Sequence, residues 1–382
     1  MSPPNAKTYK IASIPGDGIG PEVIHAAIDV LQTLSTTLNT FSLSFTHLDW
    51  NSDTYKKTGT YIPEGGLDQL RKFDAILFGA VGAPDVPDHI SLWGLRLGIC
   101  QSLHQYANLR PTRVLRGTQS PLRKCKPGDL DWLIIRENSE GEYAGQGGRS
   151  HRGTPHEVAT EVSIFTRTAV ERLMRFAFQT AKSRPRKLLT VVTKSNAQRH
   201  GMVLWDEVAN DVGKEEEFKD VKVDKMLVDA MTVRMVLEPE SLDTIVATNL
   251  VGVPPLLATF LLTMMFEQHA DILSDLAAAL AGSIGIAPTS NLDPTHINPS
   301  MFEPIHGSAF DITGKGLANP VGSFWTAAEM LTWLGEKDAG DKLLEAVENV
   351  SERGIVTRDL GGKYGTKEVT EALKGEIRKM FG

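Results

Sequence analysis

The chain has 382 residues, of which 41% are hydrophobic and 23% are charged, enough for two domains or one large α/β unit with a substantial core. A formal net charge of −7 argues against nucleic acid or an anionic membrane surface as the main partner. The two cysteines, Cys100 and Cys125, are too few for a disulfide framework, and no apolar run in the sequence reaches transmembrane length. These properties fit a reducing compartment, and we expect a cytoplasmic protein without a membrane partner.

The N-terminal region predicts a short strand at residues 10–14, a glycine-rich loop at 15–21 and a helix from 22 to about 34. The loop invites comparison with the dinucleotide-binding fingerprint, which needs glycine at its first, third and sixth positions. Gly16 and Gly18 fit that spacing, but the sixth position is Pro21. No acidic residue clearly ends a second strand at the required distance. We therefore reject a Rossmann fold.

Short β-type runs alternate with helical patterns along the rest of the chain. The runs cover residues 41–48, 75–79, 133–135, 188–192, 221–226 and 244–247. Helices are predicted at 163–183, from Ser323 to about 334, and at 339–349, while the glycine-rich residues 142–161 are expected to form an irregular arm. This alternation predicts an α/β fold with a largely parallel central sheet.

Residues 251–268 do not fit the pattern. The segment is strongly apolar, carries the pair Pro254-Pro255 near its start and has no polar face. It is too short to span a bilayer and too apolar for a surface loop. Two explanations stay open: a translated intron retained in the gene model, or a genuine insertion that forms a lid or an interface helix.

The helix predicted directly after this segment, at residues 269–282, carries two acidic side chains. Asp271 and Asp275 are four residues apart and therefore lie on one helical face. They fit two roles. Acids in a first turn are favoured by the helix dipole, and neighbouring carboxylates are also suitable oxygen ligands for a hard divalent cation.

Six motifs in chain order resemble the β-decarboxylating dehydrogenases, the isocitrate and isopropylmalate dehydrogenase family. They are PGDGIG (15–20), NLRP (108–111), RENSEGEY (136–143), TKSN (193–196), DILSD (271–275) and HGSAFD (306–311). Residues 87–94 and 183–187 are most similar to the tartrate and D-malate dehydrogenase branch. The resemblance implies a two-domain isopropylmalate dehydrogenase-like fold. A discontinuous cofactor-binding domain would comprise residues 1–111 and 288–382, and residues 112–287, which include the arm, would bind substrate and metal and form the dimer.

The resemblance also implies a reaction and the residues that perform it. A 2-hydroxy acid would lose hydride from C2 to NAD, and decarboxylation of the resulting 3-carboxy-2-oxo acid would need Mg²⁺ or Mn²⁺ as a Lewis acid. Lys194 would take the hydroxyl proton and Tyr143 would protonate the enolate, while Arg110 and Arg136 would hold carboxylates. The metal ligands would be Asp229, Asp271 and Asp275. Lys194 and Asp229 would reach the site of the neighbouring subunit, so the active unit would be a homodimer.

The resemblance places the cofactor site largely in the C-terminal third. The loop that holds adenosine would be His306, Gly307, Ser308 and Ala309, Asn319 would pair with adenine, and Ile14, Asn196 and Glu303 would complete the site. Asp311 matches the residue whose carboxylate accepts hydrogen bonds from ribose hydroxyls. A carboxylate there repels a 2′-phosphate, which predicts NAD rather than NADP. Phe310 replaces the proline usual at its position, and we expect no change of cofactor from it.

The substrate pocket departs from the family pattern. The family's first carboxylate-binding arginine, ten positions before Arg110, is Cys100 here. Arg96 lies four residues earlier, on the same face if the stretch is helical, and is expected to supply the missing guanidinium. A cation beside Trp93 and Leu97 disfavours an apolar substituent, which would be desolvated without a partner. We expect a polar substrate of the tartrate or D-malate kind, with 3-isopropylmalate as the alternative.

A second class of function stays open, namely a catalytically inactive relative that keeps the fold and acts as a regulatory or structural subunit. Lys194, Tyr143 and the retained arginines favour an enzyme. Cys100 and the segment 251–268 favour the inactive relative. Metal-dependent production of NADH would separate the two.

Overall fold

The structure, a computed structural model, describes residues 7–123, 125, 128–249 and 272–382. The chain divides into two compact units. The first contains residues 1–105, 113–123 and 278–382, and the second contains residues 106–112 and 124–277. The apolar segment 251–268 and Asp271 lie outside the described residues. In the part that is described, no helix is long and apolar enough to cross a membrane.

The first unit is of the α/β type, with strands of the central sheet and helices packed beside them. Their order is β2 (Phe41–His47), β1 (Lys7–Gly16), β3 (Ala75–Ala80), β12 (Ser300–Pro304) and β11 (Pro288–Leu292). β1 is parallel to β2 and β3, and β12 is parallel to β3, whereas β11 is antiparallel to β12. All six positions of β3 are buried, as expected for a parallel strand covered on both faces.

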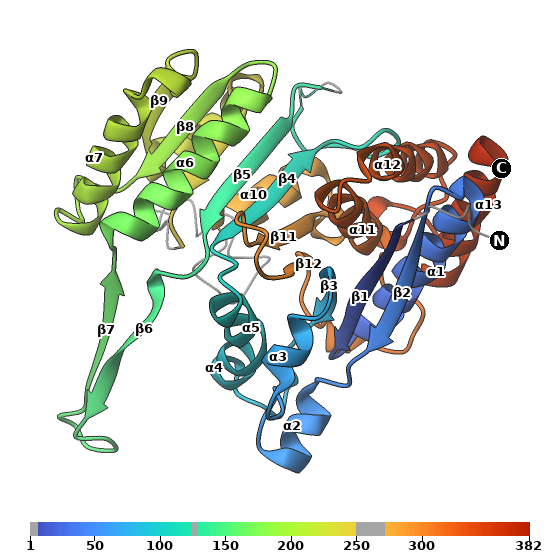
Figure 1. Cartoon of the computed structure of the whole chain (residues 1–382), viewed down its shortest axis with the longest axis horizontal. Helices are drawn as coiled ribbons and strands as arrows, with labels where there is room; N and C mark the ends of the chain where they lie inside the picture. The colour runs from blue at the N-terminus through green and yellow to red at the C-terminus, as the bar shows by residue number, and fades with distance from the viewer. Residues whose placement is uncertain (1–6, 124, 126–127, 250–271) are drawn as a thin grey trace. The chain divides into compact units, whose positions relative to one another are not determined.

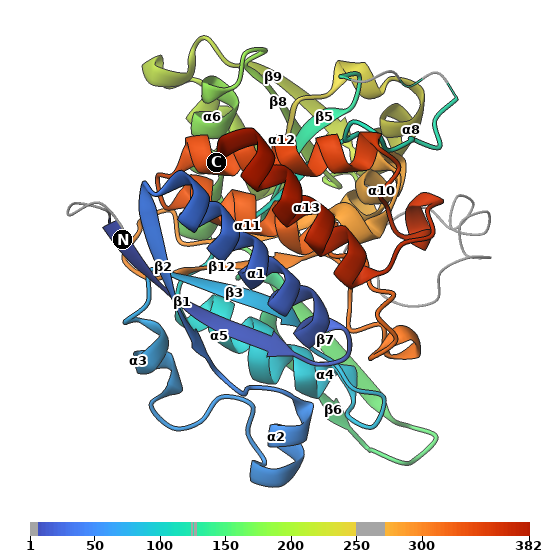
Figure 2. The ribbon, with the colours of Figure 1, turned by 90° about the vertical axis from the view of Figure 1, so that its right-hand side faces the viewer.

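Four long helices of this unit pack against one another (Figure 2). They are α1 (Gly20–Leu38), α11 (Val321–Trp333), α12 (Lys337–Glu352) and α13 (Thr366–Phe381). In α1, Val23, Ala27, Val30 and Leu34 recur at helical spacing and are buried, which gives the helix one apolar face. Shorter helices are α2 (Ser52–Thr58), α3 (Gly66–Leu70), α4 (Asp88–Ser91) and α5 (Leu97–Ser102), with a π-helical turn at Leu92–Arg96 between the last two.

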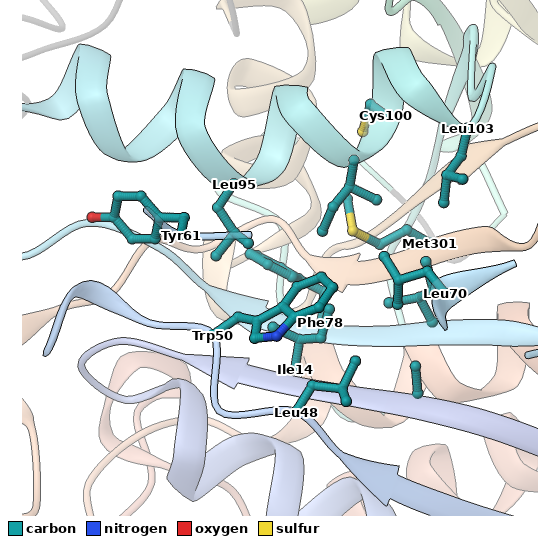
Figure 3. Packing of buried hydrophobic residues seen from close by; sticks show 13 residues of the cluster. Ile14, Leu48, Trp50, Tyr61, Leu70, Phe78, Leu95, Cys100, Leu103 and Met301 are labelled. Carbon is teal, nitrogen blue, oxygen red and sulfur yellow. The ribbon is translucent and has the colours of Figure 1, made fainter. Parts of the chain in front are cut away.

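A hydrophobic cluster joins α5 and the π-helical turn to the strands of the first unit (Figure 3). Ile14, Phe78 and Met301 come from β1, β3 and β12, and Leu95 and Cys100 come from the helical side. Cys100 is fully buried in this cluster and therefore belongs to the core of the unit. Burying one large apolar side chain in such a core stabilises a fold by about 1.5–3 kcal/mol.

The second unit has the strand order β4 (Ala107–Arg113), β5 (Asp131–Glu137), β10 (Thr244–Ala247), β8 (Leu188–Thr193) and β9 (Lys222–Leu227). β10 is parallel to β5 and β8, and β8 is parallel to β9. Its helices are α6 (Arg167–Ser183), α7 (Gly201–Gly213) and α8 (Val228–Leu237), and α10 (Ile272–Ala281) begins in it.

A two-stranded hairpin extends from the second unit (Figure 1). It consists of β6 (Gly141–Ser150) and β7 (Val158–Ile164), which are antiparallel. Residues 142–161 were expected to be irregular, yet most of them are in regular strands. The helix predicted from Ser163 begins instead at Arg167, because β7 continues to Ile164 and the Thr166 side chain accepts a hydrogen bond from Ala169 N as the helix cap.

Candidate functional site

The glycine-rich loop after β1 packs closely against the loop predicted to hold the cofactor, within the first unit. Gly16 and Gly18 have φ angles of +70° and +60°. A Cβ on Gly18 would lie 1.9 Å from the carbonyl oxygen of Ser308, and one on Gly16 would lie 1.9 Å from that of Ala80. Ile19 N donates to Ser308 O at 2.8 Å. Close backbone approach therefore explains both glycines.

Asp17, between these glycines, fixes the loop. Its buried carboxylate accepts hydrogen bonds from Ser52 N at 2.8 Å, from Ser52 Oγ at 2.6 Å and from Gly82 N at 2.9 Å. Three donors to one carboxylate hold the ends of β1 and β3 and the start of α2 together. Asp17 was not among the predicted site residues, although an acid between two glycines at a strand end is a signal for such a role.

His306 gives the predicted cofactor loop an acceptor atom. Its Nδ1 is 3.1 Å from Gly307 O, so Nδ1 carries the proton and Nε2 is the acceptor. Nε2 is buried and has no hydrogen-bond partner among the described residues. Burial lowers the pKa of His306, against the opposing effect of the Asp359 and Glu303 carboxylates. Ala309, three residues later, has a φ of +40°, a strained conformation of the kind found at ligand-binding loops.

The other residues predicted for the cofactor site differ in burial and in their hydrogen-bond partners. Asp311 is exposed, in the 3₁₀ turn Phe310–Ile312. Asn319 is buried and engaged, because it donates to Asp359 Oδ2 at 2.8 Å and accepts from Val321 N at 3.0 Å. Ile14 is fully buried in the core, so only its backbone could meet a ligand. Asn196 is exposed on the second unit.

Arg96 and Cys100 lie in very different surroundings within the first unit. Arg96 Nε donates to Glu303 Oε1 at 2.7 Å, and its Nη2 is 3.3 Å from Asn291 Oδ1. Asn291 also donates to Glu303 Oε1 at 2.8 Å. Cys100 is fully buried among apolar side chains (Figure 3). The guanidinium predicted for the substrate is thus held by a carboxylate predicted for the cofactor site.

Arg110, on β4, lies beside the predicted metal-binding helix of the second unit. Its Nε donates to Asn108 Oδ1 at 2.9 Å and its Nη1 donates to Ser274 Oγ at 2.6 Å. The same Nη1 is 3.8 Å from Asp275 Oδ1 on α10. Arg110 is 5% exposed, so a cation is kept in the interior next to one of the predicted ligands.

Arg136, at the end of β5, is also buried and is tied to the predicted acid. Its Nη2 donates to Tyr143 Oη at 2.9 Å, and its Nε donates to Asn249 Oδ1 at 3.1 Å. Asn249 is fully buried and donates in turn to Glu137 Oε2 at 3.1 Å and to Glu140 O at 2.6 Å. The structure therefore joins the predicted Arg136 and Tyr143 directly, and it adds Asn249, which was not predicted, as a further partner of Arg136.

Glu137, next to Arg136 on β5, is a buried carboxylate that the sequence analysis also missed. It accepts from Ser139 N at 2.8 Å, Ser139 Oγ at 2.7 Å and Glu140 N at 2.6 Å, in addition to Asn249. Burial raises the pKa of Glu137, and these hydrogen bonds act against the rise. The sequence feature that could have marked Glu137 as a functional residue is its position within the motif at 136–143.

Lys194 and Asp229 form an ion pair within the second unit, between the end of β8 and the first turn of α8. The pair uses Asp229 Oδ2, while Oδ1 is buried without a hydrogen-bond partner in the described part of the chain. An unsatisfied carboxylate oxygen fits a ligand for a hard cation. Asp275 is 35% exposed at its side chain, and Asp271 lies outside the described residues. The described residues by themselves contain no group of three or more His, Cys, Asp or Glu side chains placed to hold a metal ion.

Comparisons with known proteins give three kinds of match. The family model described as "Isocitrate/isopropylmalate dehydrogenase" matches residues 10–254 and 257–373. The "Probable tartrate dehydrogenase/decarboxylase TtuC'" of Agrobacterium vitis is 65% identical over 367 residues, 96% of this chain and 97% of that protein. The "D-malate dehydrogenase (decarboxylating)" of Escherichia coli (strain K12) is 45% identical over 374 residues, 96% of this chain and 98% of that protein.

A solved structure agrees with these matches. The crystal structure of isocitrate dehydrogenase from Methylococcus capsulatus has a TM-score of 0.83 at 32% sequence identity and covers 97% of this chain and 99% of that one. The predicted fold class, α/β with largely parallel strands and not a Rossmann fold, is confirmed.

Proposed function

The chain belongs to the isocitrate/isopropylmalate dehydrogenase family, as its six ordered motifs predicted, and we propose that it oxidises a small 2-hydroxy dicarboxylic acid of the tartrate or D-malate kind. NAD would be the oxidant, Mg²⁺ or Mn²⁺ the metal, and β-decarboxylation would follow where the product is a 3-carboxy-2-oxo acid. The cytoplasm is the proposed location.

One observation carries the proposal: Arg110 and Arg136 are both 5% exposed, on neighbouring strands of the second unit. Arg110 donates to Asn108 and Ser274 and lies 3.8 Å from Asp275 Oδ1, and Arg136 donates to Asn249 and Tyr143. A guanidinium group suits an anion with carboxylate geometry, because it can donate two parallel hydrogen bonds to it. Two such groups suit a dicarboxylic acid.

The roles of the chain's own residues follow from these contacts. Bound NAD would accept hydride from C2, and a bound divalent cation would act as Lewis acid toward the substrate oxygen. Lys194, which pairs with Asp229 as an ammonium group, would first lose a proton to water and would then take the hydroxyl proton as a neutral amine. Tyr143 would protonate the enolate carbon. Because Arg136 donates to Tyr143 Oη, the phenol oxygen is the acceptor in that bond and its own O–H remains a donor.

The residues present fit both absent groups. Asp229 Oδ1 is a buried carboxylate oxygen without a partner in the described residues, and Asp275 and Asp271 would join it as metal ligands. His306 Nε2 is a buried acceptor near Ser308 and Ala309, where adenosine would lie. The exposed Asp311 carboxylate would accept ribose hydroxyls and repel a 2′-phosphate, which favours NAD.

A homodimer is supported by apolar side chains on the surface of the second unit. Val158 and Val162 of β7 are 51% and 50% exposed, and Leu237 of α8 is 72% exposed. A two-stranded hairpin is at best marginally stable alone, so β6 and β7 require a covering surface. A second copy of the chain would supply it, and Lys194 and Asp229, which lie at the end of β8 and in the first turn of α8, would then reach the neighbouring site.

The test compares NADH production from tartrate, D-malate and 3-isopropylmalate, with and without Mg²⁺ or Mn²⁺, on one preparation of the 382-residue chain and on one of the chain without residues 251–268. We expect metal-dependent activity and the highest kcat/KM with tartrate or D-malate. A preference for 3-isopropylmalate of about tenfold, about 1.4 kcal/mol in transition-state binding, would instead establish the alternative substrate. Absence of NADH with all three would favour the catalytically inactive relative.

A further inference from the structure

The loop that carries Tyr143 is fastened by two residues outside the proposed catalytic set. We propose that Asn249 and Glu137 are positioning residues that hold Arg136 and the loop at 138–143 so that the Tyr143 hydroxyl faces the reacting carbon. The inference rests on the proposed function, in which Tyr143 is the acid. It concerns residues of the second unit only.

Asn249 holds Tyr143 from two sides. Its Oδ1 accepts from Arg136 Nε at 3.1 Å, and Arg136 Nη2 donates to Tyr143 Oη at 2.9 Å. Its Nδ2 donates to Glu140 O at 2.6 Å, and the same carbonyl accepts from Tyr143 N at 3.3 Å. Side-chain hydroxyl and backbone amide of the tyrosine are therefore both attached to groups that Asn249 binds.

Glu137 fixes the orientation of Asn249. Its Oε2 accepts from Asn249 Nδ2 at 3.1 Å, from Ser139 N at 2.8 Å and from Glu140 N at 2.6 Å. The amide of Asn249 must then point its oxygen toward Arg136, because its nitrogen is taken by two acceptors. Glu137 is 3% exposed and Asn249 is fully buried, so water does not compete for these bonds.

A further contact ties the same loop to α6. Glu140 accepts from Thr166 N at 2.8 Å and from Thr166 Oγ1 at 2.7 Å, at the start of that helix. Arg172 of α6 donates to Ser139 Oγ at 2.8 Å. The loop is thus held on one side by a helix and on the other by Asn249, which leaves little freedom for the tyrosine between them.

This arrangement serves the transfer of a proton from the Tyr143 hydroxyl to a carbon atom of the substrate. After hydride has left C2 and CO₂ has left the substrate, the Tyr143 O–H bond breaks and a C–H bond forms at the former carboxyl-bearing carbon. Water then returns a proton to the phenol oxygen. A displacement of about 1 Å in a reacting group can slow a step by about 10²-fold.

The experiment uses the unsubstituted chain and four variants, each with and without residues 251–268: Asn249→Ala, Glu137→Ala, Glu137→Gln and Asp243→Asn. Glu137→Gln keeps an acceptor oxygen at the position of Oε2, the atom that accepts three hydrogen bonds. Asp243→Asn is the matched control, because Asp243 is 1% exposed, pairs with Arg184 at 2.6 Å and lies at the opposite end of β10 from Asn249. Thermal unfolding shows which variants fold, and Asn249→Asp replaces Asn249→Ala if that variant does not.

Two readouts are needed. Amide hydrogen exchange of residues 138–143 in the ligand-free chain reports the loop itself. The deuterium isotope effect with substrate labelled at C2 reports whether hydride transfer or a later step limits kcat. We expect Asn249→Ala and Glu137→Ala to raise exchange at least tenfold and to lower kcat 10- to 100-fold, with the isotope effect on kcat falling toward 1 and that on kcat/KM unchanged. Glu137→Gln should keep hydrogen exchange and kcat close to those of the unsubstituted chain. Asp243→Asn should change neither hydrogen exchange nor kcat.

Unchanged exchange and unchanged kcat in Asn249→Ala would overturn the proposal. A loss of kcat with an undiminished isotope effect would also overturn it, because the variant would then act on hydride transfer. If the unsubstituted chain makes no NADH either with or without residues 251–268, the proposed function fails, while the exchange comparison still decides whether Asn249 and Glu137 hold the loop.

Discussion

The guanidinium of Arg96 lies 2.7 Å from the carboxylate of Glu303, and both side chains belong to the interior of the first unit, 13% and 8% exposed. Removing one partner of a buried pair leaves an uncompensated charge, which typically costs about 3–5 kcal/mol. Arg96 can therefore influence catalysis in two ways, by reaching the substrate or by holding Glu303 and Asn291 in place.

Arg96→Ala is expected to lower kcat/KM for the hydroxy acid at least tenfold and to lower the unfolding temperature. Cys100→Ala should have near-normal kcat/KM, because the thiol lies in the apolar core and its loss costs about 1 kcal/mol of stability. Arg184→Ala is the control, since Arg184 pairs with Asp243 at 2.6 Å in the second unit and is outside the proposed site. Steady-state kinetics beside thermal unfolding makes the comparison, and a greater kinetic loss in Cys100→Ala would remove Arg96 from the site.

Asp311→Asn is expected to weaken the preference for NAD. The variant loses the negative charge that repels a 2′-phosphate and the strong acceptor for ribose hydroxyls. We expect kcat/KM for NADP to rise about tenfold and that for NAD to fall, because each tenfold step corresponds to about 1.4 kcal/mol. Asp338→Asn, a change at an exposed side chain of α12 in the same unit, should leave both constants as they are. Better use of NADP than NAD by the unsubstituted chain would refute the cofactor prediction.

His306 is expected to make the fold less stable in acid. Burial lowers the pKa of His306, so the folded chain resists a proton that the unfolded chain accepts near the ordinary pKa of about 6.5. The neutral imidazole thus contributes stability that is complete above about pH 6.5 and is lost as the pH falls toward the lowered pKa. Between pH 7.5 and 5, the free energy of unfolding should fall more for the unsubstituted chain than for His306→Gln, by at most about 1.4 kcal/mol per pH unit.

Chemical denaturation at several pH values makes this measurement. His156→Gln is the control, because His156 is exposed in the turn between β6 and β7. Parallel pH curves for the unsubstituted chain and His306→Gln would show that His306 is protonated in the folded state as easily as in the unfolded one.

The sequence predicted the parts of the fold and site that depend on local pattern. The alternation of strands and helices, the glycine loop and the motif carrying Arg136 and Tyr143 could all be read from neighbouring residues. Asn249 could not, because its partner Glu137 is 112 positions earlier and the bond exists only once β10 lies beside β5. Side-chain direction was also hidden: Cys100 occupies the position of a family arginine yet is part of the core.

The start of α6 at Arg167 is another feature that the local sequence pattern did not predict. Ile164 and Phe165 are apolar, and the helix was predicted to start at Ser163. The hairpin register, in which Gly141 pairs with Ile164, keeps the chain extended there. Pairing between strands therefore overrides a helical pattern that is read from sequence alone.

Residues 251–268 are expected to be absent from the mature enzyme. Removing these 18 residues joins Asn249-Leu250 directly to His269-Ala270-Asp271 and restores the short strand-to-helix turn that the family resemblance implies. The family model matches residues 10–254 and 257–373, so its match breaks within this segment, at residues 255 and 256 only. Eighteen codons preserve the reading frame, Val251 can begin with GT, Gln268 can be CAG, and Leu262-Thr263 can contain CTGAC, as a retained intron requires.

The position of the segment makes the two alternatives distinguishable by activity. It follows Asn249, which holds the Tyr143 loop, and precedes Asp271 and Asp275, the proposed metal ligands. Since a shift of about 1 Å in a catalytic group can cost about 10²-fold in rate, we expect the 382-residue chain to be weakly active or inactive and the 364-residue chain without the segment to be fully active. Sequencing the transcript and assaying both chains for metal-dependent NADH production tests this. A message that carries all 54 nucleotides as its major form, together with equal activity of the two chains, would establish the segment as a genuine insertion.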